Sequence, residues 1–317
     1  MYQKEKIKAI FIQNFFRSGG SYLYNQFIDH ENHMGFYEPF HEDLSDSQKI
    51  EEGRLKFRER VKLLNHPNKE FYFQNFPLDE KWFKNFHKIN KNLNFFFIKD
   101  QSVPAIQKYL TDLISYSASM DKLPIFKINR LYLNPEILEI DNIYKVFLFR
   151  EPISSFFSNI NLNLLRPYYY RTFLLANENI EPFKSLWNLG ITNKINHIVF
   201  KNNKVEFASK KDLEIHYSIF FFIWLFGLYK NLNLNFSFIN YSKLDDLSYS
   251  KNISKEIIDH CGFKINFSNF VKKKDKIYKL HIDICEEVIY LINQFMNREK
   301  VEKILIENFD FLLKKIN

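Results

Sequence analysis

Short apolar runs alternate along this 317-residue chain with stretches whose apolar residues recur at helical spacing. A short apolar run between turn residues is typical of a buried strand, and strands that alternate with helices are typical of a parallel sheet. The run YKVFLF is almost continuously apolar, so we expect this strand to be buried on both faces. The predicted strands are residues 7–14, 71–76, 95–98, 125–128, 144–149 and 236–240.

Helical spacing fills the segments between and after these runs. The predicted helices are residues 21–30, a helix after Arg150 with Pro152 in its first turn, and residues 213–231, 253–261, 281–296 and 301–313. No internal repeat and no low-complexity linker interrupts the pattern. We therefore predict an α/β fold of three layers, a parallel sheet flanked by helices, in one domain over residues 1–317 with a helix-rich C-terminal part.

The charge and the cysteine and histidine content narrow the classes of partner. The net charge of +8 suits an anionic partner, such as a nucleotide, a nucleic acid, a sulfated sugar or a membrane surface, although most of these lysines are expected on a solvated surface. The two cysteines, Cys261 and Cys285, are too few for a disulfide framework, so we predict free thiols in a reducing compartment. No two histidines stand at zinc spacing, and we predict no metal.

The sequence contains no segment typical of export or of membrane insertion. Its first residues lack the apolar core and cleavage site of a signal peptide. The most apolar run, residues 217–229, is shorter than the ~20 residues that span a bilayer, and we interpret it as a buried core helix. A peripheral contact of this run with a membrane is the second interpretation. We expect the cytoplasm, or its inner membrane face, as the compartment.

The segment IFIQNFFRSGGSYLYNQF has the pattern of a strand, a tight turn and a helix. Gly19 and Gly20 are two of only seven glycines, and glycine lets the backbone approach a ligand closely. Ser18 and Ser21 supply hydroxyl groups, and Arg17 supplies a planar cation suited to phosphoryl or sulfuryl oxygens. An ordinary loop with a serine N-cap is the alternative. No G-x-x-x-x-G-K-[ST] motif is present, which argues against an ATPase or a GTPase.

A second segment, YKVFLFREPISSFFSN, begins with another predicted strand. Arg150 follows this strand, and Ser158 stands eight residues after Arg150. Ligands of open parallel sheets bind at the carboxyl ends of strands, where Arg150 is expected. Taken alone, Ser154, Ser155 and Ser158 would be the polar side of an amphipathic helix.

Together the two segments resemble the donor-binding motifs of the sulfotransferases that use 3′-phosphoadenosine 5′-phosphosulfate (PAPS). FFRSGGSYL is similar to their 5′-phosphosulfate loop, and the Arg–Ser pair is similar to their 3′-phosphate motif. The resemblance implies a P-loop NTPase-like fold, PAPS as donor and 3′-phosphoadenosine 5′-phosphate (PAP) as product. It implies that the 5′-phosphosulfate is held by Arg17, Ser18, Gly19, Gly20, Ser21 and Tyr22, and the 3′-phosphate by Arg150 and Ser158.

A third segment, FSFINYSKL, resembles a family strand that ends in Tyr-x-x-Leu. This resemblance implies that Tyr241 lies near the adenine or the 3′-phosphate. A core tyrosine is an equal alternative.

Sulfuryl transfer needs a base for the acceptor and cations for the moving group. Glu38 is the predicted base, because it follows a short predicted strand that Pro39 ends, where the Golgi-type and bacterial branches carry a catalytic Glu. His41 is the rival base. Lys127 resembles the active-site Lys after the family's middle strand, and with Arg17 it would stabilise the transferred group. Arg130 would bind an anionic acceptor or the donor.

The sequence departs from one branch of this family. The cytosolic phenol and steroid sulfotransferases carry Lys-x-His where this chain has Lys127, Ile128 and Asn129, so their histidine base is absent. The departure favours Glu38 and the Golgi-type or bacterial branches, and the composition also has a bacterial character.

The expected acceptor is a hydroxyl group of a small molecule, a carbohydrate or a cell-surface glycan. Residues 164–200 are expected to form its pocket, and the basic run 272–276 is either a cover for the 3′-phosphate or a solvated surface. The alternatives are a nucleotide-dependent kinase or glycosyltransferase and a basic module that binds nucleic acid or a membrane. We favour an enzyme without a nucleic-acid partner. No motif indicates the oligomeric state.

Overall fold

The computed structural model of this chain describes residues 7–15, 17–64, 71–90, 93–94, 97–98, 103–161, 183–188, 199–201, 204–206, 209–267, 270, 283–296, 302–303 and 305–307. They form two compact units. Unit 1 comprises Met1–Phe15, Gly19–Phe149 and Asn235–Lys272, and unit 2 comprises Phe16–Ser18, Arg150–Leu234 and Lys273–Asn317. The expectation of a single domain over residues 1–317 stays a prediction.

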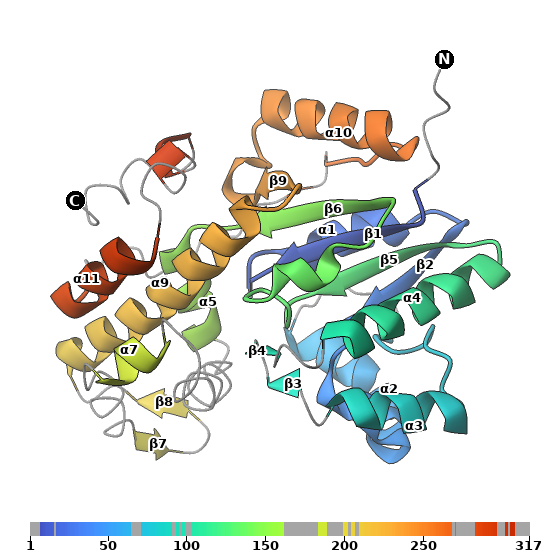
Figure 1. Ribbon diagram of the computed structural model, residues 1–317, viewed down its shortest axis with the longest axis horizontal. Helices are drawn as coiled ribbons and strands as arrows, with labels where there is room; N and C mark the ends of the chain where they lie inside the picture. Colours follow the sequence, from blue (N-terminus) through green and yellow to red (C-terminus); the bar gives the residue numbers. More distant parts are fainter. Residues whose placement is uncertain are drawn as a thin grey trace. The chain divides into compact units, whose positions relative to one another are not determined.

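The elements of unit 1 alternate strands and helices, as the sequence predicted (Figure 1). They are β1 Ala9–Asn14, α1 Gly20–Ile28, β2 His33–Tyr37, η1 Glu42–Ser45, α2 Ser47–Leu64, α3 Glu80–Asn90, β3 Leu93–Asn94, β4 Phe97–Ile98, α4 Val103–Ser119, β5 Leu123–Ile128, η3 Pro135–Leu138, β6 Ile143–Phe149, β9 Ser237–Asn240, η4 Tyr241–Lys243 and α10 Leu247–Cys261.

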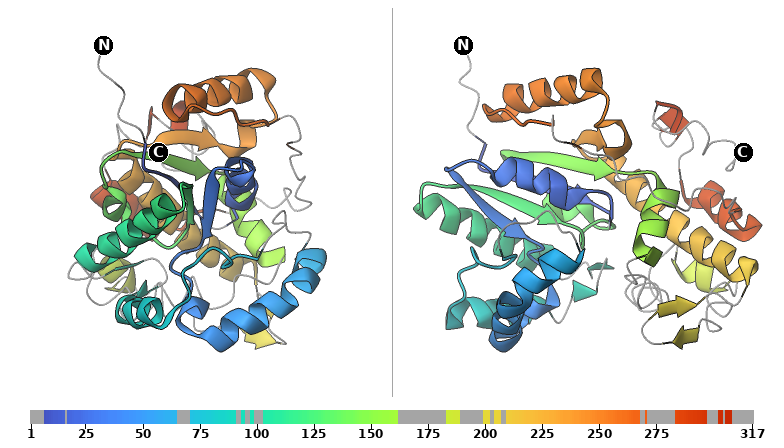
Figure 2. Two further views of the ribbon diagram at one scale, coloured as in Figure 1. Left: turned by 90° about the vertical axis from the view of Figure 1, so that its right-hand side faces the viewer. Right: turned by 180° about the vertical axis from the view of Figure 1, so that it is seen from behind.

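The central sheet of unit 1 has five strands in the order β2-β5-β1-β6-β9, and every neighbouring pair is parallel. In Figure 1, α4 lies on the face of the sheet turned toward the viewer, and Figure 2, from behind, shows α1 on the opposite face. This arrangement confirms the predicted three-layer α/β fold with a parallel sheet.

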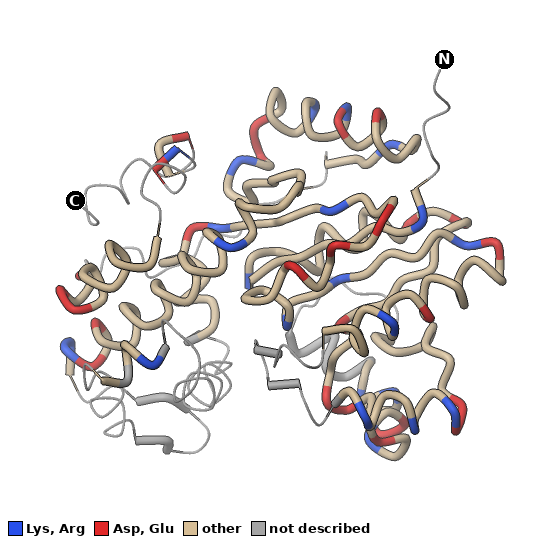
Figure 3. The backbone as a smooth tube through the Cα atoms, in the orientation of Figure 1, with Lys and Arg blue, Asp and Glu red and all other residues tan. Residues whose placement is uncertain are grey.

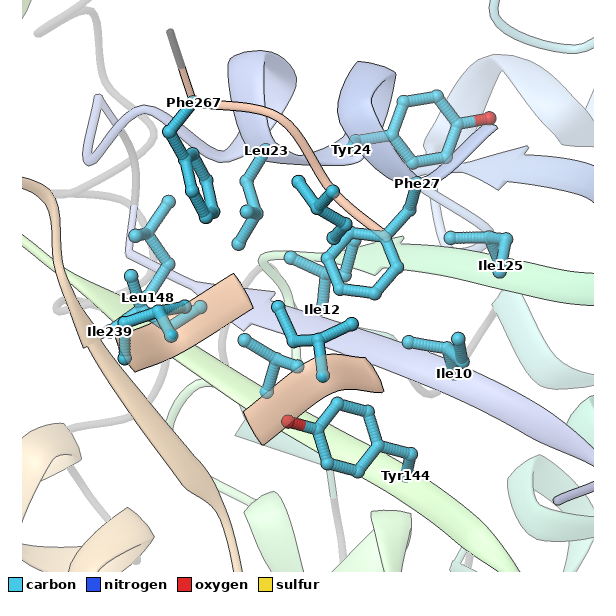
Figure 4. Packing of buried hydrophobic residues seen from close by; sticks show 14 of the residues in the cluster. Ile10, Ile12, Leu23, Tyr24, Phe27, Ile125, Tyr144, Leu148, Ile239 and Phe267 are labelled. Carbon is cyan, nitrogen blue, oxygen red and sulfur yellow. The ribbon is translucent and has the colours of Figure 1, made fainter. Parts of the chain in front are cut away.

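Alternate residues of the strands build the two faces of this sheet. Ile10 and Ile12 pack against Leu23 and Phe27 of α1, all with no exposed surface, in a cluster that also includes residues of α10 (Figure 4). Phe11 points to the other face. Burying an apolar side chain of this size contributes about 1.5–3 kcal/mol, so this packing holds α1 on this face of the sheet.

The strand order creates a switch point between β1 and β6. These neighbouring strands continue to opposite edges of the sheet, because the chain runs from β1 through α1 to β2 and from β6 to β9. Ligands of open parallel sheets bind outside the carboxyl ends of the strands at such a point. Arg17 and Arg150 follow these two strands in the chain.

Unit 2 is built around a long buried helix. Its elements are α5 Pro152–Asn161, α7 Phe183–Asn188, β7 Val199–Lys201, β8 Lys204–Glu206, α9 Lys210–Leu232 and α11 Glu286–Phe295. Phe156 of α5 packs against Tyr217 and Phe220 of α9 at ring distances of 5.3 Å. Most residues of α9 from 215 to 228 are buried, which confirms the expected core helix. Within the described ranges, no helix has the length and apolar character that crossing a membrane requires.

One predicted strand forms turns instead, and another lies outside the parallel sheet. Residues 71–76 form turns, because their aromatic side chains pack around the end of β2: Tyr72 stacks on Tyr37, and Phe76 packs edge-to-face on Phe36. Residues 97–98 are a strand, but they pair antiparallel with residues 93–94 outside the parallel sheet. Helices α2, α3 and α4 were not predicted.

The charges and cysteines agree with the sequence-based expectations where they are described. Helix α10 carries Lys251 and Lys255 followed by Glu256 and Asp259, so its surface has charges of both signs (Figure 3). Cys261 and Cys285 are free thiols of intermediate burial, as predicted. The basic run 272–276 lies outside the described residues, as does most of residues 164–200.

Candidate functional site

The turn between β1 and α1 depends on two glycines. Gly19 has a φ of 89°, in the left-handed region, and it is the N-cap of α1. A Cβ atom at Gly19 would collide with the ring of Tyr241, and one at Gly20 would collide with the side-chain amide of Asn14. The turn therefore needs glycine at both positions, because a different side chain lies close to each of them.

The N-terminus of α1 carries no capping side chain and no acidic residue in its first turn. A serine N-cap, the alternative interpretation, is therefore wrong. The Ser21 hydroxyl bonds instead to the Tyr37 hydroxyl at 2.5 Å. The Ser18 hydroxyl is buried and has no hydrogen-bond partner among the described residues. A helix N-terminus without a cap offers backbone N–H groups and a positive dipole end, which suit an anion.

Unit 2 brings together residues of the two predicted donor motifs. Arg17 Nε donates to Ser158 Oγ at 3.2 Å, and Arg150 Nη1 donates to the Arg17 carbonyl at 3.2 Å. The Arg150 carbonyl accepts from Trp224 Nε1 of α9 at 3.1 Å. Arg150 and Ser158 are both buried. Arg17 thus contacts Arg150 through its carbonyl and Ser158 of α5 through its guanidinium, and a group of two cations and a hydroxyl suits an anion.

An aromatic group adjoins Gly19 in unit 1. The Phe270 ring packs edge-to-face against Tyr22 at 5.1 Å and against Tyr241 at 5.0 Å. Burial, helped by the nearby Tyr241, raises the pKa of Tyr22 to about 12, so its phenol stays neutral at physiological pH. Phe270 was not predicted, because a Phe among 36 carries no signal of its own.

Glu38 and Lys127 form a buried ion pair at the ends of β2 and β5. Lys127 Nζ donates to Glu38 Oε1, and the Glu38 backbone N–H donates to the Lys127 carbonyl at 2.9 Å. Both side chains are less than a tenth exposed. Glu38 has a φ of 50°, a conformation that costs a non-glycine residue free energy and is often found at functional sites.

His41 follows Glu38 by one turn and is held as a neutral ring. Its Nδ1 accepts from the Asp43 backbone N–H at 3.2 Å. Burial and the charge of Arg130 lower the pKa of His41 below its ordinary value, although the carboxylates of Glu42, Asp43 and Glu38 oppose this shift. Since Nδ1 accepts, the proton of the neutral ring lies on Nε2, and His41 can donate there.

Arg130 forms a second ion pair beside the first. Its Nη2 donates to Glu42 Oε2, and its side chain is 9% exposed. Burial of Glu42 acts to raise its pKa, but the charges of Arg130 and His41 and the hydrogen bonds to the carboxylate together outweigh this effect and lower it. The Glu42 carboxylate therefore already balances the positive charge of Arg130.

The structure groups the predicted site residues by unit. Unit 1 contains Gly19, Gly20, Ser21, Tyr22 and Tyr241 at one place, and Glu38, His41, Lys127 and Arg130 at another, while unit 2 contains Arg17, Ser18, Arg150 and Ser158. Tyr37 connects the two groups of unit 1 and was missed, although it directly precedes Glu38 in the predicted short strand. Across the described ranges, no three His, Cys, Asp or Glu side chains could hold a metal ion.

Comparison with known proteins gives one structural similarity. No protein-family model matches the sequence, and no curated protein matches it. Among solved structures, the fold is similar to a sulfotransferase domain from the curacin biosynthetic pathway, with a TM-score of 0.40 and 14% sequence identity over 96% of this chain and 98% of that chain.

Proposed function

We propose that this protein is a sulfotransferase that moves a sulfuryl group from PAPS to a hydroxyl group of an acceptor. The observation that carries this proposal is the pair of hydrogen bonds that joins Arg17 to Arg150 and Ser158. Each motif alone has an ordinary structural explanation. Their direct contact in the folded chain is expected if both hold one anionic donor.

The residues fit a donor with phosphate groups at both ends. In the proposal, the turn from Arg17 to Tyr22 holds the 5′-phosphosulfate through backbone N–H groups and the Ser18 hydroxyl, which lacks a described protein partner. Arg150 and Ser158 hold the 3′-phosphate. Tyr241, beside Gly19, lies against the adenine. When bound, PAPS supplies an activated sulfuryl group on a phosphate leaving group.

Glu38 fits the role of general base better than His41 does. A base must accept the proton of the acceptor hydroxyl, and the carboxylate of Glu38 can accept while Lys127 holds its other oxygen. The neutral His41 ring uses Nδ1 for the Asp43 N–H and has its proton on Nε2, so it acts as a hydrogen-bond donor. The ammonium of Lys127 adds positive charge near the transferred group.

Arg130 is proposed to line the acceptor side of Glu38. An anionic acceptor would have to compete with the Glu42 carboxylate for its guanidinium. We therefore propose a neutral hydroxyl acceptor, on a small molecule or a glycan, and not a polyanionic one.

The donor assignment is tested by thermal unfolding with nucleotides. PAP should raise the melting temperature well above the effect of an equal concentration of AMP, because at one concentration the ligand that binds the folded state more tightly stabilises it more. Arg150→Ala should remove most of the PAP preference, since a hydrogen bond to a charged group contributes about 1.5–3 kcal/mol. Arg54→Ala, which alters an exposed surface ion pair, is the matched control. Equal stabilisation of the unaltered protein by PAP and AMP would refute the proposal.

The base assignment is tested by turnover with labelled PAPS and a panel of neutral and anionic hydroxyl acceptors. Glu38→Gln should lose transfer and keep the PAP-dependent rise in melting temperature. His41→Asn should keep measurable transfer. Normal turnover by the Glu38→Gln variant would show that another residue is the base.

A further inference from the structure

Tyr37 contacts both groups of predicted site residues in unit 1. It is the last residue of β2, directly before Glu38, and its side chain is buried. We propose that Tyr37 is a positioning residue that fixes the donor-binding turn relative to the Glu38–Lys127 pair. This inference rests on the proposed function, and nothing in the motifs of the sequence assigns it.

The first contact is with the donor-binding turn. The Tyr37 hydroxyl and the Ser21 hydroxyl are 2.5 Å apart, and Ser21 is the second residue of α1. Ser21 lies within the helix, and the N-cap of α1 is Gly19, which has no side chain to cap it. The bond therefore fixes the first turn of α1 to the sheet, at the end of the helix whose positive dipole suits an anion.

The second contact is with the catalytic ion pair. Lys127 Nζ lies 4.5 Å from the centroid of the Tyr37 ring, a distance at which the ring face attracts an ammonium group. Tyr37 and Lys127 are also partners in the register of β2 and β5. Lys127 is thus held between the Tyr37 ring and the Glu38 carboxylate, and its position depends on both.

The ring itself is held in place by its aromatic neighbours. Tyr72 stacks on it at 4.4 Å with an interplanar angle of 13°, and Tyr24 of α1 packs edge-to-face at 5.3 Å. Tyr24, in turn, packs where a side chain on Gly35 would collide with its hydroxyl. A ring fixed on several sides relates the position of Ser21 rigidly to that of Lys127, which a mobile side chain could not do.

Two substitutions separate the two contacts. Tyr37→Phe removes only the hydroxyl group, so the KM for PAPS should rise about five- to tenfold while kcat changes little. Tyr37→Leu also removes the ring, so kcat should fall as well. Tyr144→Phe is the matched control, because Tyr144 is a buried tyrosine of the same core at the opposite end of the sheet, and it should leave both constants unchanged.

A double-mutant cycle distinguishes positioning from general stability. Once Ser21→Ala has removed the partner hydroxyl, Tyr37→Phe should have no further effect on the KM for PAPS. Independent effects of the two substitutions, or a Tyr37→Phe variant that matches Tyr144→Phe, would overturn the inference and leave the proposed function standing. An unaltered protein that PAP does not stabilise more than AMP would overturn the proposed function and this inference together.

Discussion

Replacing Glu38 with Gln leaves the ammonium of Lys127 without the carboxylate that pairs with it. The lysine is 4% exposed and the glutamate 7% exposed, so water replaces little of the lost interaction. Removing one partner of a buried ion pair costs about 3–5 kcal/mol, because the remaining charge stays buried. A domain is stable by only about 5–15 kcal/mol, so a large part of the stability of unit 1 should be lost.

A second substitution should restore much of that loss. Lys127→Met alone leaves the Glu38 carboxylate buried and should destabilise by a similar amount. In the double variant Glu38→Gln/Lys127→Met no net charge remains buried, and such replacements are often neutral. We expect the double variant to be at least about 3 kcal/mol more stable than the sum of the two single losses predicts.

Urea unfolding at pH 7, followed by circular dichroism, measures these differences. The exposed pair Glu51 and Arg54 is the control, with side chains 53% and 62% exposed, and its double-mutant cycle should give only weak coupling. The two variants that lack Glu38 should lack transfer activity, since a restored fold does not restore the base, and Lys127→Met should lose activity because the cation near the transferred group is gone. Single losses that simply add in the double variant would refute the view that these two charges are buried against each other.

Three further perturbations follow from burial and backbone conformation. Burial lowers the pKa of His216 to about 3, so the unfolded chain binds a proton at this side chain at higher pH than the folded protein does. The free energy of unfolding should therefore fall by up to about 1.4 kcal/mol per pH unit as the pH drops below about 6.5. His216→Leu should remove this slope in urea titrations at pH 7 and 5, and an unchanged slope would contradict the assignment. Gly19→Ala should lower the free energy of unfolding by more than about 2 kcal/mol, because it adds a collision with Tyr241 to a strained φ. Gly262 has a φ of 80° and open space around it, so Gly262→Ala should cost only about 1 kcal/mol in the same assay. Burial and the charge of Glu256 raise the pKa of Cys261 to about 12. Iodoacetamide at pH 8 should therefore modify Cys261 at least about a hundred times more slowly than free cysteine, as followed by mass spectrometry. Comparable rates would show that the thiol is not buried.

The strands that carry the donor motifs could be predicted because their signal is local. β1, β5 and β6 are apolar runs covered on both faces, and such runs stand out from any sequence that surrounds them. Arg17 and Arg150 follow two of these runs directly, so their place at strand ends was also a local inference. Pro152 begins α5 as expected, since proline needs no N–H partner in the first turn.

The features that could not be predicted depend on partners distant in the sequence. Residues 71–76 have the composition of a strand, but their rings find neighbours on β2, and only the folded chain supplies those neighbours. The role of Tyr37 depends on its register with Lys127, some ninety residues away, and on Ser21 across the layer. Periodicity does not encode register between strands. The polar helix α2 was missed because its apolar stripe is thin.

The backbone supplies a reason for Arg17 and Glu38 that is independent of any motif. Among the described residues, the non-glycine residues with positive φ are Arg17, Glu38, Asp121 and Asn142. Asp and Asn tolerate this conformation, but it costs about 1–2 kcal/mol at Arg or Glu. A glycine would fit either position without that strain, as Gly19 does two residues after Arg17. The presence of Arg and Glu is therefore explained by what their side chains do, and strain that persists for the sake of a charged side chain is the pattern of a functional site.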